Sequence, residues 1–196
     1  MSANPLNVLF VGNSYTYYNQ MPEEAFKSLA REAGYEISVT SVTHGGYRLS
    51  QFADPEDEEG GRLRETICGV HYDFAVLQEQ SVTPIKNEEA FLAGISGVMD
   101  LISADNFILY ATWGRNDGSP TLTELGLTRE EMTEKLSLAY NAAGKRFGAR
   151  VAEVGRAFLE YSKRHDKDDL YNPDMSHPST LGSALAARVI FEQIAK

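Results

Sequence analysis

Cysteine is nearly absent from this sequence: Cys68 is the one cysteine among 196 residues. A single cysteine excludes an internal disulfide and fits a reducing compartment. Positive charge is also scarce, because 18 lysines and arginines face 28 aspartates and glutamates, for a formal net charge of -10. This field repels polyanions and no lysine-arginine stripe offsets it, so we do not expect nucleic acid as a partner.

Long hydrophobic runs are missing as well. No stretch approaches the length that spans a bilayer, which argues against a membrane partner. Residues 1–5 include no basic residue, and the apolar run after them is too short for a signal peptide. We therefore expect a cytoplasmic location, although a chain whose leader had been removed would look the same.

Motifs for metals and nucleotides are absent too. The chain has no H-E-x-x-H, C-x-x-C or P-loop pattern. The acidic run Asp54–Glu59 lacks the alternating ligands and the glycine of a calcium loop, which indicates a solvated loop. We expect neither a metal nor an organic cofactor.

What remains is an ordinary globular composition, with 42% hydrophobic and 23% charged residues. The length is most economically one domain over residues 1–196, without repeats or linkers. Apolar strand-like segments alternate with amphipathic helix-like ones. We expect strands at 6–11, 37–42, 73–77, 107–111 and 150–154, and helices at 22–34, 88–103, after a capping box at 128–131, and at 179–195.

This alternation, with continuously apolar strands, predicts a parallel sheet covered by helices on both faces. About five strands in this length suggest an open three-layer α/β/α sandwich and not a barrel. Such proteins place their chemistry where the strands end. Four loops at expected strand ends carry polar or glycine-rich residues, namely 12–16, 44–46, 78–81 and 174–177.

Three residues in these loops have the types needed for nucleophilic catalysis. Ser14 follows the first strand, and Asp174 lies three residues before His177, so the two can face the same way. Pro178 biases His177 toward a loop before the last helix. Together they would supply a nucleophile, a base and an orienting acid. Taken singly, each loop also fits an ordinary structural turn.

A fifth loop follows the fourth strand and contains Trp113, Arg115 and Asn116. These residues could line a pocket, while a loop packed by one tryptophan is an equally good interpretation. The chain lacks the G-x-S-x-G elbow of α/β-hydrolases around Ser14.

In combination, the end blocks resemble those of the SGNH (GDSL-type) hydrolase family. Gly12-Asn13-Ser14 resembles the G-D-S block after the family's first strand, and Asp174-Met175-Ser176-His177 resembles its D-x-x-H block before the last helix. The resemblance spans the chain in order. It implies a flavodoxin-like sandwich of five parallel strands, with Ser14 as nucleophile, His177 as base and Asp174 as its partner.

The resemblance also implies an oxyanion hole, in which the Ser14 N–H is one donor. A glycine after the second strand would be another, with Gly46 the best match and Gly45 the alternative. The family places an asparagine after the third strand, where this chain has Gln78-Glu79-Gln80-Ser81. Gln80 falls at that position and carries the same amide on a longer arm, with Gln78 as its rival. We also expect Gln78 as a possible pocket residue, beside Trp113 and Arg115.

The sequence therefore predicts a serine esterase that acts on a small-molecule ester. The resemblance implies short acyl groups, with acetyl groups on carbohydrate as one candidate. Two alternatives stay open: a non-catalytic α/β module that binds a small phosphate or sugar ligand, and an acyl- or phosphoryltransferase that uses the same serine. No feature of the sequence specifies an oligomeric state.

Overall fold

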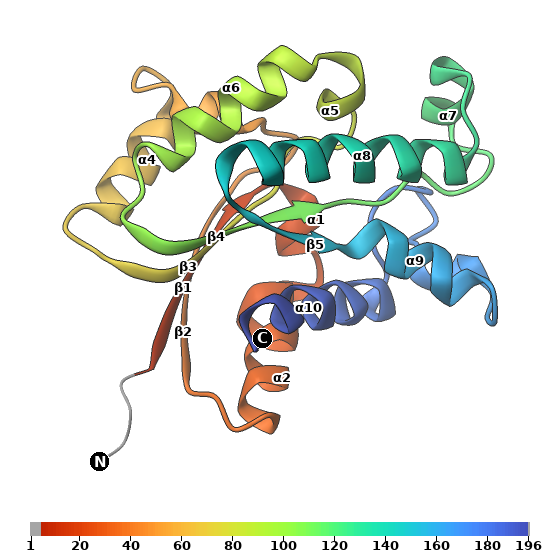
Figure 1. Cartoon of the computed structure of the whole chain (residues 1–196). Coiled ribbons are helices and arrows are strands. Elements are labelled where there is room, and N and C mark those ends of the chain that lie inside the picture. The colour runs from red at the N-terminus through yellow and green to blue at the C-terminus, as the bar shows by residue number, and fades with distance from the viewer. Residues whose placement is uncertain (1–4, 196) are drawn as a thin grey trace.

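The computed structural model describes residues 5–195, so residues 1–4, on which part of the leader-peptide expectation rests, lie outside it (Figure 1). Five strands form one parallel sheet in the order β2-β1-β3-β4-β5, which confirms the expected sheet. The strands are β1 (Leu6–Gly12), β2 (Ile37–Thr43), β3 (Tyr72–Leu77), β4 (Ala104–Ala111) and β5 (Arg150–Glu153).

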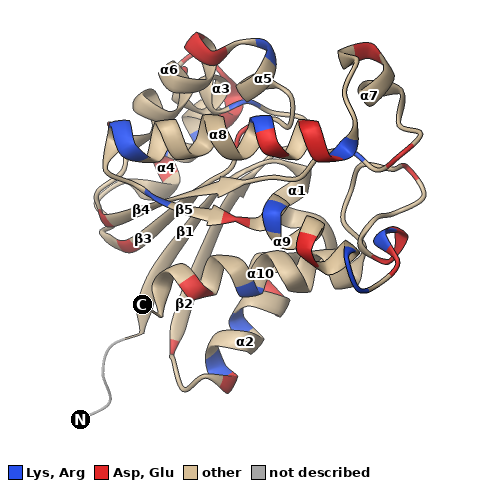
Figure 2. Cartoon of the chain, turned by 45° about the vertical axis from the view of Figure 1, so that its right-hand side comes forward, with Lys and Arg blue, Asp and Glu red and all other residues tan. Residues whose placement is uncertain are grey.

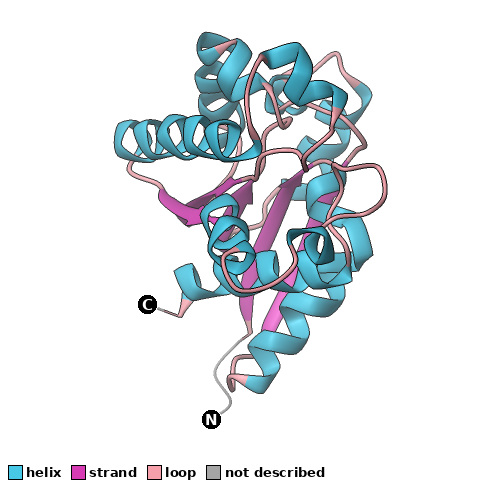
Figure 3. Cartoon of the chain, turned by 90° about the vertical axis from the view of Figure 1, so that its right-hand side faces the viewer, coloured by secondary structure: helices cyan, strands magenta, loops and turns pink. Residues whose placement is uncertain are grey.

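Helices cover both faces of the sheet, as Figures 1 and 3 show. One face packs against α3 (Leu49–Ala53), α4 (Glu58–Ile67), α6 (Glu88–Met99) and α8 (Arg129–Phe147). The other packs against α1 (Ser14–Tyr17), η2 (Met21–Phe26), α2 (Lys27–Glu32), α9 (Val154–Ser162), η3 (Lys167–Leu170) and α10 (Thr180–Ile194). The short segments η1 (Tyr18–Gln20), α5 (Thr83–Lys86) and α7 (Pro120–Leu125) complete the chain.

The central strand β1 shows why its sequence is apolar throughout. Val8 and Phe10 enter the core beside α10, whereas Leu9 and Val11 enter the core beside α6. All four side chains are fully buried. A strand covered on both faces needs apolar residues at every position, not at alternate ones.

The strand order also fixes where a ligand can enter. β1 pairs with β2 on one side and with β3 on the other. The connections that leave β1 and β3 therefore diverge, and a crevice opens at their carboxyl ends. The loops at 12–16, 44–46 and 78–81 all belong to these three strands.

Two expected helices differ in detail from the observed ones. The segment expected at 22–34 begins as the single wide turn η2 and continues as α2. The segment expected at 88–103 ends at Met99, because the chain turns through Ile102, whose N–H donates to Met99 O, before β4 starts at Ala104.

The charges of α8 follow its dipole. α8 has its expected capping box, in which Thr128 and Glu131 bond reciprocally, with acidic residues in the first turn and Lys145 and Arg146 in the last. Figure 2 shows lysine and arginine interspersed with acidic residues along the helices. Within residues 5–195, no helix combines the length and the apolar character that crossing a bilayer requires.

Candidate active site

Residues from separate loops meet around a cavity of about 390 Å³ at the carboxyl ends of the strands. Its lining includes Ser14 after β1, Gly46 after β2, Gln80 after β3 and His177 before α10. Arg115, which follows β4, lines it as well. The structure thus brings together four of the expected catalytic and oxyanion residues and one expected pocket residue.

Ser14, His177 and Asp174 form a continuous hydrogen-bonded chain. The Oγ of Ser14 lies 2.8 Å from Nε2 of His177, and Nδ1 of His177 lies 2.5 Å from Oδ2 of Asp174. A carboxylate only accepts, so Nδ1 carries the proton and Nε2 accepts the hydroxyl proton of Ser14. This tautomer is the one that can deprotonate a serine.

The turn from Asp174 to His177 holds the acid in place. Oδ1 of Asp174 accepts from the backbone N–H groups of Ser176 and His177, both at 2.9 Å. Burial alone would raise the pKa of Asp174, but the His177 ring and these N–H groups lower it below its ordinary value. Met175 closes the turn with φ +62°, an unusual conformation for a residue with a side chain. The carboxylate therefore stays charged beside the imidazole.

The imidazole of His177 is also held by aromatic rings. Tyr18 stacks on it, with centroids 4.3 Å apart and planes 13° apart, and Tyr15 meets it edge-on at 5.7 Å. Asn19, at φ 55°, donates through Nδ2 to the backbone oxygen of Pro178 at 3.0 Å, which ties the Tyr18 segment to the base. Sequence analysis missed Tyr18, because nothing in the order of residues shows that it faces a histidine near the other end of the chain.

Two backbone N–H groups at the cavity are free to bind an oxyanion. Within the described part of the chain, no hydrogen-bond acceptor contacts the N–H of Ser14 or of Gly46. Gly46 adopts φ +75°, which favours glycine. Asn13 couples the two loops, because its Oδ1 accepts from Tyr15 N while its Nδ2 donates to the backbone oxygen of Tyr47 at 2.9 Å.

The structure distinguishes the two glutamines that the sequence left as rivals. Oε1 of Gln80 accepts from Val82 N, Thr83 N and Thr83 Oγ1 at 3.0–3.2 Å, which fixes the orientation of the amide. No acceptor in residues 5–195 contacts its Nε2. Gln80 therefore presents a free, oriented N–H donor to the lining of the cavity.

Gln78 does not line the cavity, contrary to expectation. It is 1% exposed, and its Oε1 accepts from Asn13 N and Thr16 Oγ1, both at 2.9 Å. Its Nε2 donates to the backbone oxygen of Glu79. Gly12 leaves room for this side chain, since an added Cβ would lie 2.8 Å from Gln78 Oε1. Gln78 therefore fixes the loop that carries Ser14.

Trp113 is also outside the cavity, because its ring is fully buried behind Tyr15. It stacks between Tyr15 at 4.6 Å and Phe158 at 4.3 Å, and its Nε1 donates to the backbone oxygen of Ser176 at 3.1 Å. Trp113 thus packs behind the cavity wall and contacts the residues next to Ser14 and His177. Arg115, two residues later, reaches the cavity as expected.

A fully buried carboxylate, Glu79, lies directly beneath the Gln80 loop, and sequence analysis did not single it out. Its Oε1 accepts from Gln80 N at 2.5 Å and its Oε2 from Leu49 N at 3.2 Å. Burial raises its pKa from 4.5 to about 7, against the lowering effect of these N–H groups. Its position just after an apolar strand was the only sequence signal, and nothing in the sequence showed that it is buried.

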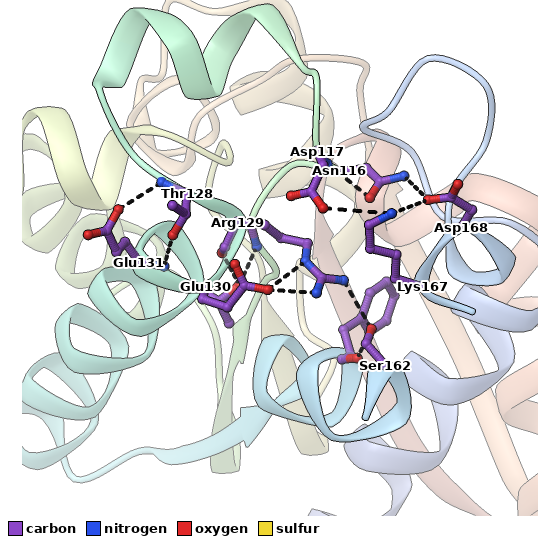
Figure 4. Close-up of polar contacts among 12 residues, drawn as sticks. Asn116, Asp117, Thr128, Arg129, Glu130, Glu131, Ser162, Lys167 and Asp168 are labelled. Carbon is purple, nitrogen blue, oxygen red and sulfur yellow. Dashed lines mark hydrogen bonds and ion pairs between the residues drawn. The ribbon is translucent and has the colours of Figure 1, made fainter. Parts of the chain in front are cut away.

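The loop that leads to the acid and the base is anchored to the loop after β4, as Figure 4 shows. Asn116 Nδ2 donates to Asp168 Oδ1 at 2.8 Å, and Lys167 Nζ lies 3.6 Å from Asp117 Oδ2. The N–H of Asn116 donates to the backbone oxygen of Met175 at 2.8 Å. Asn116 therefore belongs to this anchoring network and does not line the cavity.

A second Ser-His-Asp arrangement lies at the opposite ends of the strands. His71, which precedes β3, contacts Ser103 Oγ at 2.8 Å through Nδ1 and Asp105 Oδ1 at 3.0 Å through Nε2. The side chains of His71 and Asp105 are 57% and 60% exposed, against 25% for that of His177. Exposed pairs of this kind are solvent-screened and contribute little.

Solved structures of other proteins share the fold of this chain. No family model matches the sequence, and no curated protein sequence matches it. A candidate SGNH hydrolase from Slackia heliotrinireducens is similar over 97% of this chain and 100% of that one, with a TM-score of 0.84 and 29% identity.

Two further solved structures share the fold at lower identity. A DUF4886 family protein from Bacteroides uniformis ATCC 8492 has a TM-score of 0.73 and 17% identity, over 96% of this chain and 82% of that one. A candidate GDSL-like lipase from Parabacteroides merdae ATCC 43184 has a TM-score of 0.71 and 12% identity, over 97% and 95%. The chain therefore has the fold of the SGNH (GDSL-type) hydrolases over almost its whole length.

Proposed function

We propose that this protein hydrolyses a carboxylic ester of a small molecule through an acyl-enzyme on Ser14. The observation that carries the proposal is the hydrogen-bonded chain from Asp174 through His177 to Ser14 at the cavity wall. A serine alone is a weak nucleophile, and an adjacent base oriented by an acid activates it.

The first half-reaction forms the acyl-enzyme. Ser14 Oγ attacks the ester carbonyl carbon as its proton passes to Nε2 of His177. The tetrahedral intermediate collapses, the bond to the alcohol oxygen breaks, and His177 returns the proton to that oxygen. Asp174 stabilises the imidazolium that exists between these two steps.

The second half-reaction releases the acid. Water gives a proton to His177 and attacks the acyl carbon, after which the bond to Ser14 Oγ breaks and the proton returns to the serine. In both halves the N–H groups of Ser14 and Gly46, with Nε2 of Gln80, would bind the oxyanion. Each such donor is typically worth about 10²–10³ in kcat.

The size of the cavity favours a small substrate. Its volume of about 390 Å³ lies near the lower end of ligand sites. This supports a short acyl group, of which acetyl is the simplest, on a small alcohol. The steps require only water and residues of this chain, and a cytoplasmic location stays a prediction that cell fractionation tests.

Labelling with a fluorophosphonate probe, combined with hydrolysis of p-nitrophenyl acetate, tests the proposal. We expect labelling and turnover in the wild-type protein and in Ser103→Ala, and neither in Ser14→Ala. Ser103 is the matched control because it also contacts a histidine with an aspartate partner.

Three outcomes would contradict the proposal. Labelling that survives in Ser14→Ala and disappears in Ser103→Ala would move the chemistry to the opposite end of the sheet. A folded wild-type protein that is neither labelled nor active would favour a binding module. Acyl transfer to an added alcohol that outpaces hydrolysis in water would indicate a transferase.

A further inference from the structure

We propose that Arg115 forms an anion subsite in the cavity. The natural ester would then carry a negatively charged group, on its acyl side or its alcohol side, in addition to the ester bond that is cleaved. The inference rests on the proposed esterase function and names its substrate class. Arg115 lines the same cavity as Ser14 and His177. The following observations about its guanidinium support the proposal.

The guanidinium of Arg115 is held in one place by two other residues of the cavity wall. Its Nη2 donates to Ser81 Oγ at 2.8 Å, and its central carbon lies 5.4 Å from the centroid of the Tyr15 ring. Ser81 and Tyr15 both line the cavity. A cation fixed on an aromatic face loses little further freedom when a ligand binds.

Arg115 has no acidic partner, although acidic residues outnumber basic ones by 28 to 18. None of the ion pairs within residues 5–195 involves it. No aspartate or glutamate lines the cavity, and Asp174 is engaged by His177. The one fixed positive charge of the cavity wall is therefore not neutralised by a carboxylate contact in the described residues.

The Nε of Arg115 is buried and has no hydrogen-bond acceptor among the described residues. Arg129 offers a contrast, because its Nε and Nη2 donate to Glu130 and its Nη1 donates to Ser162, as Figure 4 shows. A buried donor without an acceptor is destabilising. At Arg115 the described part of the protein leaves this N–H without an acceptor, so its own residues do not neutralise or fully coordinate the guanidinium that lines the cavity.

The remaining N–H groups of a guanidinium match two-oxygen anions in its plane, of which a carboxylate is the simplest. We therefore assign the substrate class as small esters that bear a carboxylate or a similar oxyanion. The net charge of -10 would repel such a ligand in general. A local cation beside the nucleophile would offset that repulsion at the point of binding.

The test compares charged and neutral members of two ester pairs. In one pair the charge is on the acyl side, as in the p-nitrophenyl monoester of adipic acid and its methyl ester. In the other the charge is on the alcohol side, as in m-acetoxybenzoate and its methyl ester. We expect the wild-type kcat/KM to favour the anionic member of at least one pair.

Substitution of Arg115 should remove that preference. Arg115→Gln should lower kcat/KM for the preferred anion about 10- to 100-fold more than for its neutral partner, the size of one charge-assisted bond. Arg115→Lys should recover part of the preference. Arg188→Gln, which removes the same charge from the exposed face of α10, should leave both values unchanged.

A wild-type protein that favours neither anion would overturn the proposal, and so would an equal loss for both members of each pair in folded Arg115→Gln. Equal loss would show that Arg115 only positions Ser81 and Tyr15. Hydrolysis of the neutral esters with no effect of charge defeats this inference alone, whereas absence of all hydrolysis defeats the esterase proposal itself.

Discussion

Trp113 donates its indole N–H to the backbone oxygen of Ser176, 3.1 Å away, immediately before His177 in the chain. Its ring stacks on Tyr15, immediately after Ser14. One buried side chain therefore contacts both the loop of the proposed nucleophile and the loop of the proposed base. We expect this support, together with their own hydrogen bond, to set the distance between Ser14 and His177.

Replacement of Trp113 by phenylalanine should separate these two contacts. The smaller ring can still stack on Tyr15, but the buried oxygen of Ser176 loses its donor. We expect the free energy of unfolding to fall by about 1–3 kcal/mol, which is the cost of a buried unpaired acceptor. We also expect kcat to fall. Urea unfolding and p-nitrophenyl acetate turnover measure the two effects.

Phe158→Leu is the matched control, because Phe158 packs on the other side of the indole and on Tyr171 but takes no part in the hydrogen bond from Trp113 to Ser176. It should lower stability with kcat little changed. A normal kcat in Trp113→Phe would show that the indole N–H does not position the base.

Gln80 and Gln78 should behave differently when their amides are removed. Gln80→Glu keeps the acceptor that Val82 and Thr83 use but removes the free N–H donor. We expect kcat to fall by about 10²-fold with little change in KM, because the donor acts mainly in the transition state. Gln78→Ala should instead lower the free energy of unfolding, since its bonds are all internal.

The pair of variants gives a direct comparison by steady-state kinetics and urea unfolding. Wild-type kcat in both Gln80→Glu and Gln80→Ala would leave the oxyanion to the backbone donors. A loss of kcat confined to Gln78→Ala, with stability intact, would identify Gln78 as the donor after all.

Asn13 occupies the position where the SGNH (GDSL-type) block that it resembles has aspartate, and in this structure its amide makes a hydrogen bond that aspartate could not make. Its Nδ2 donates to the backbone oxygen of Tyr47, next to Gly46, at 2.9 Å. Asn13→Asp can still accept from Tyr15 N but turns a donor into an anion facing a carbonyl oxygen. We expect the Gly46 loop to shift and kcat to fall about 10-fold, the value of one such bond.

A separate measurement distinguishes displacement from unfolding. The thermal midpoint of Asn13→Asp should fall by no more than a few degrees, since aspartate is as good a helix N-cap as asparagine. A variant with full activity would show that the amide does not hold the glycine loop.

The fold was predictable because its signals are periodic and local. The strand of Val8 to Val11 is apolar at every position, which already indicates burial on both faces. The positions of Ser14 and His177 followed from the loops after and before such segments. These properties depend only on neighbours in sequence, so one sequence is enough to infer them.

The details of the site depend on contacts that sequence does not encode locally. Gln78 and Gln80 are two residues apart, and only the direction of each side chain assigns one to the interior and the other to the cavity. Tyr18 and Trp113 act through packing against segments far along the chain. Glu79 reads as one of four polar loop residues, yet it is fully buried.

The stability of the protein should report the burial of Glu79. The pKa of this carboxyl is about 7 in the folded protein and 4.5 without burial. Between these values the folded state binds more protons than the unfolded state, so the free energy of unfolding falls as pH rises through this window. The total loss of free energy of unfolding from this group is about 3 kcal/mol. The loss is complete above the folded pKa of about 7 and absent well below pH 4.5.

The glutamine in Glu79→Gln does not titrate, so this variant lacks the pH dependence that Glu79 gives to the free energy of unfolding. In the variant, the N–H of Leu49 or of Gln80 loses its acceptor at every pH. This loss is the same at each pH, so it does not affect how the difference between the two proteins changes with pH. Other groups titrate alike in both proteins. The wild-type advantage over the variant, measured by urea unfolding, should therefore shrink by about 3 kcal/mol from about pH 4 to pH 8. A difference that stays constant over this range would mean that the buried carboxyl has an ordinary pKa, held there by the N–H groups of Leu49 and Gln80.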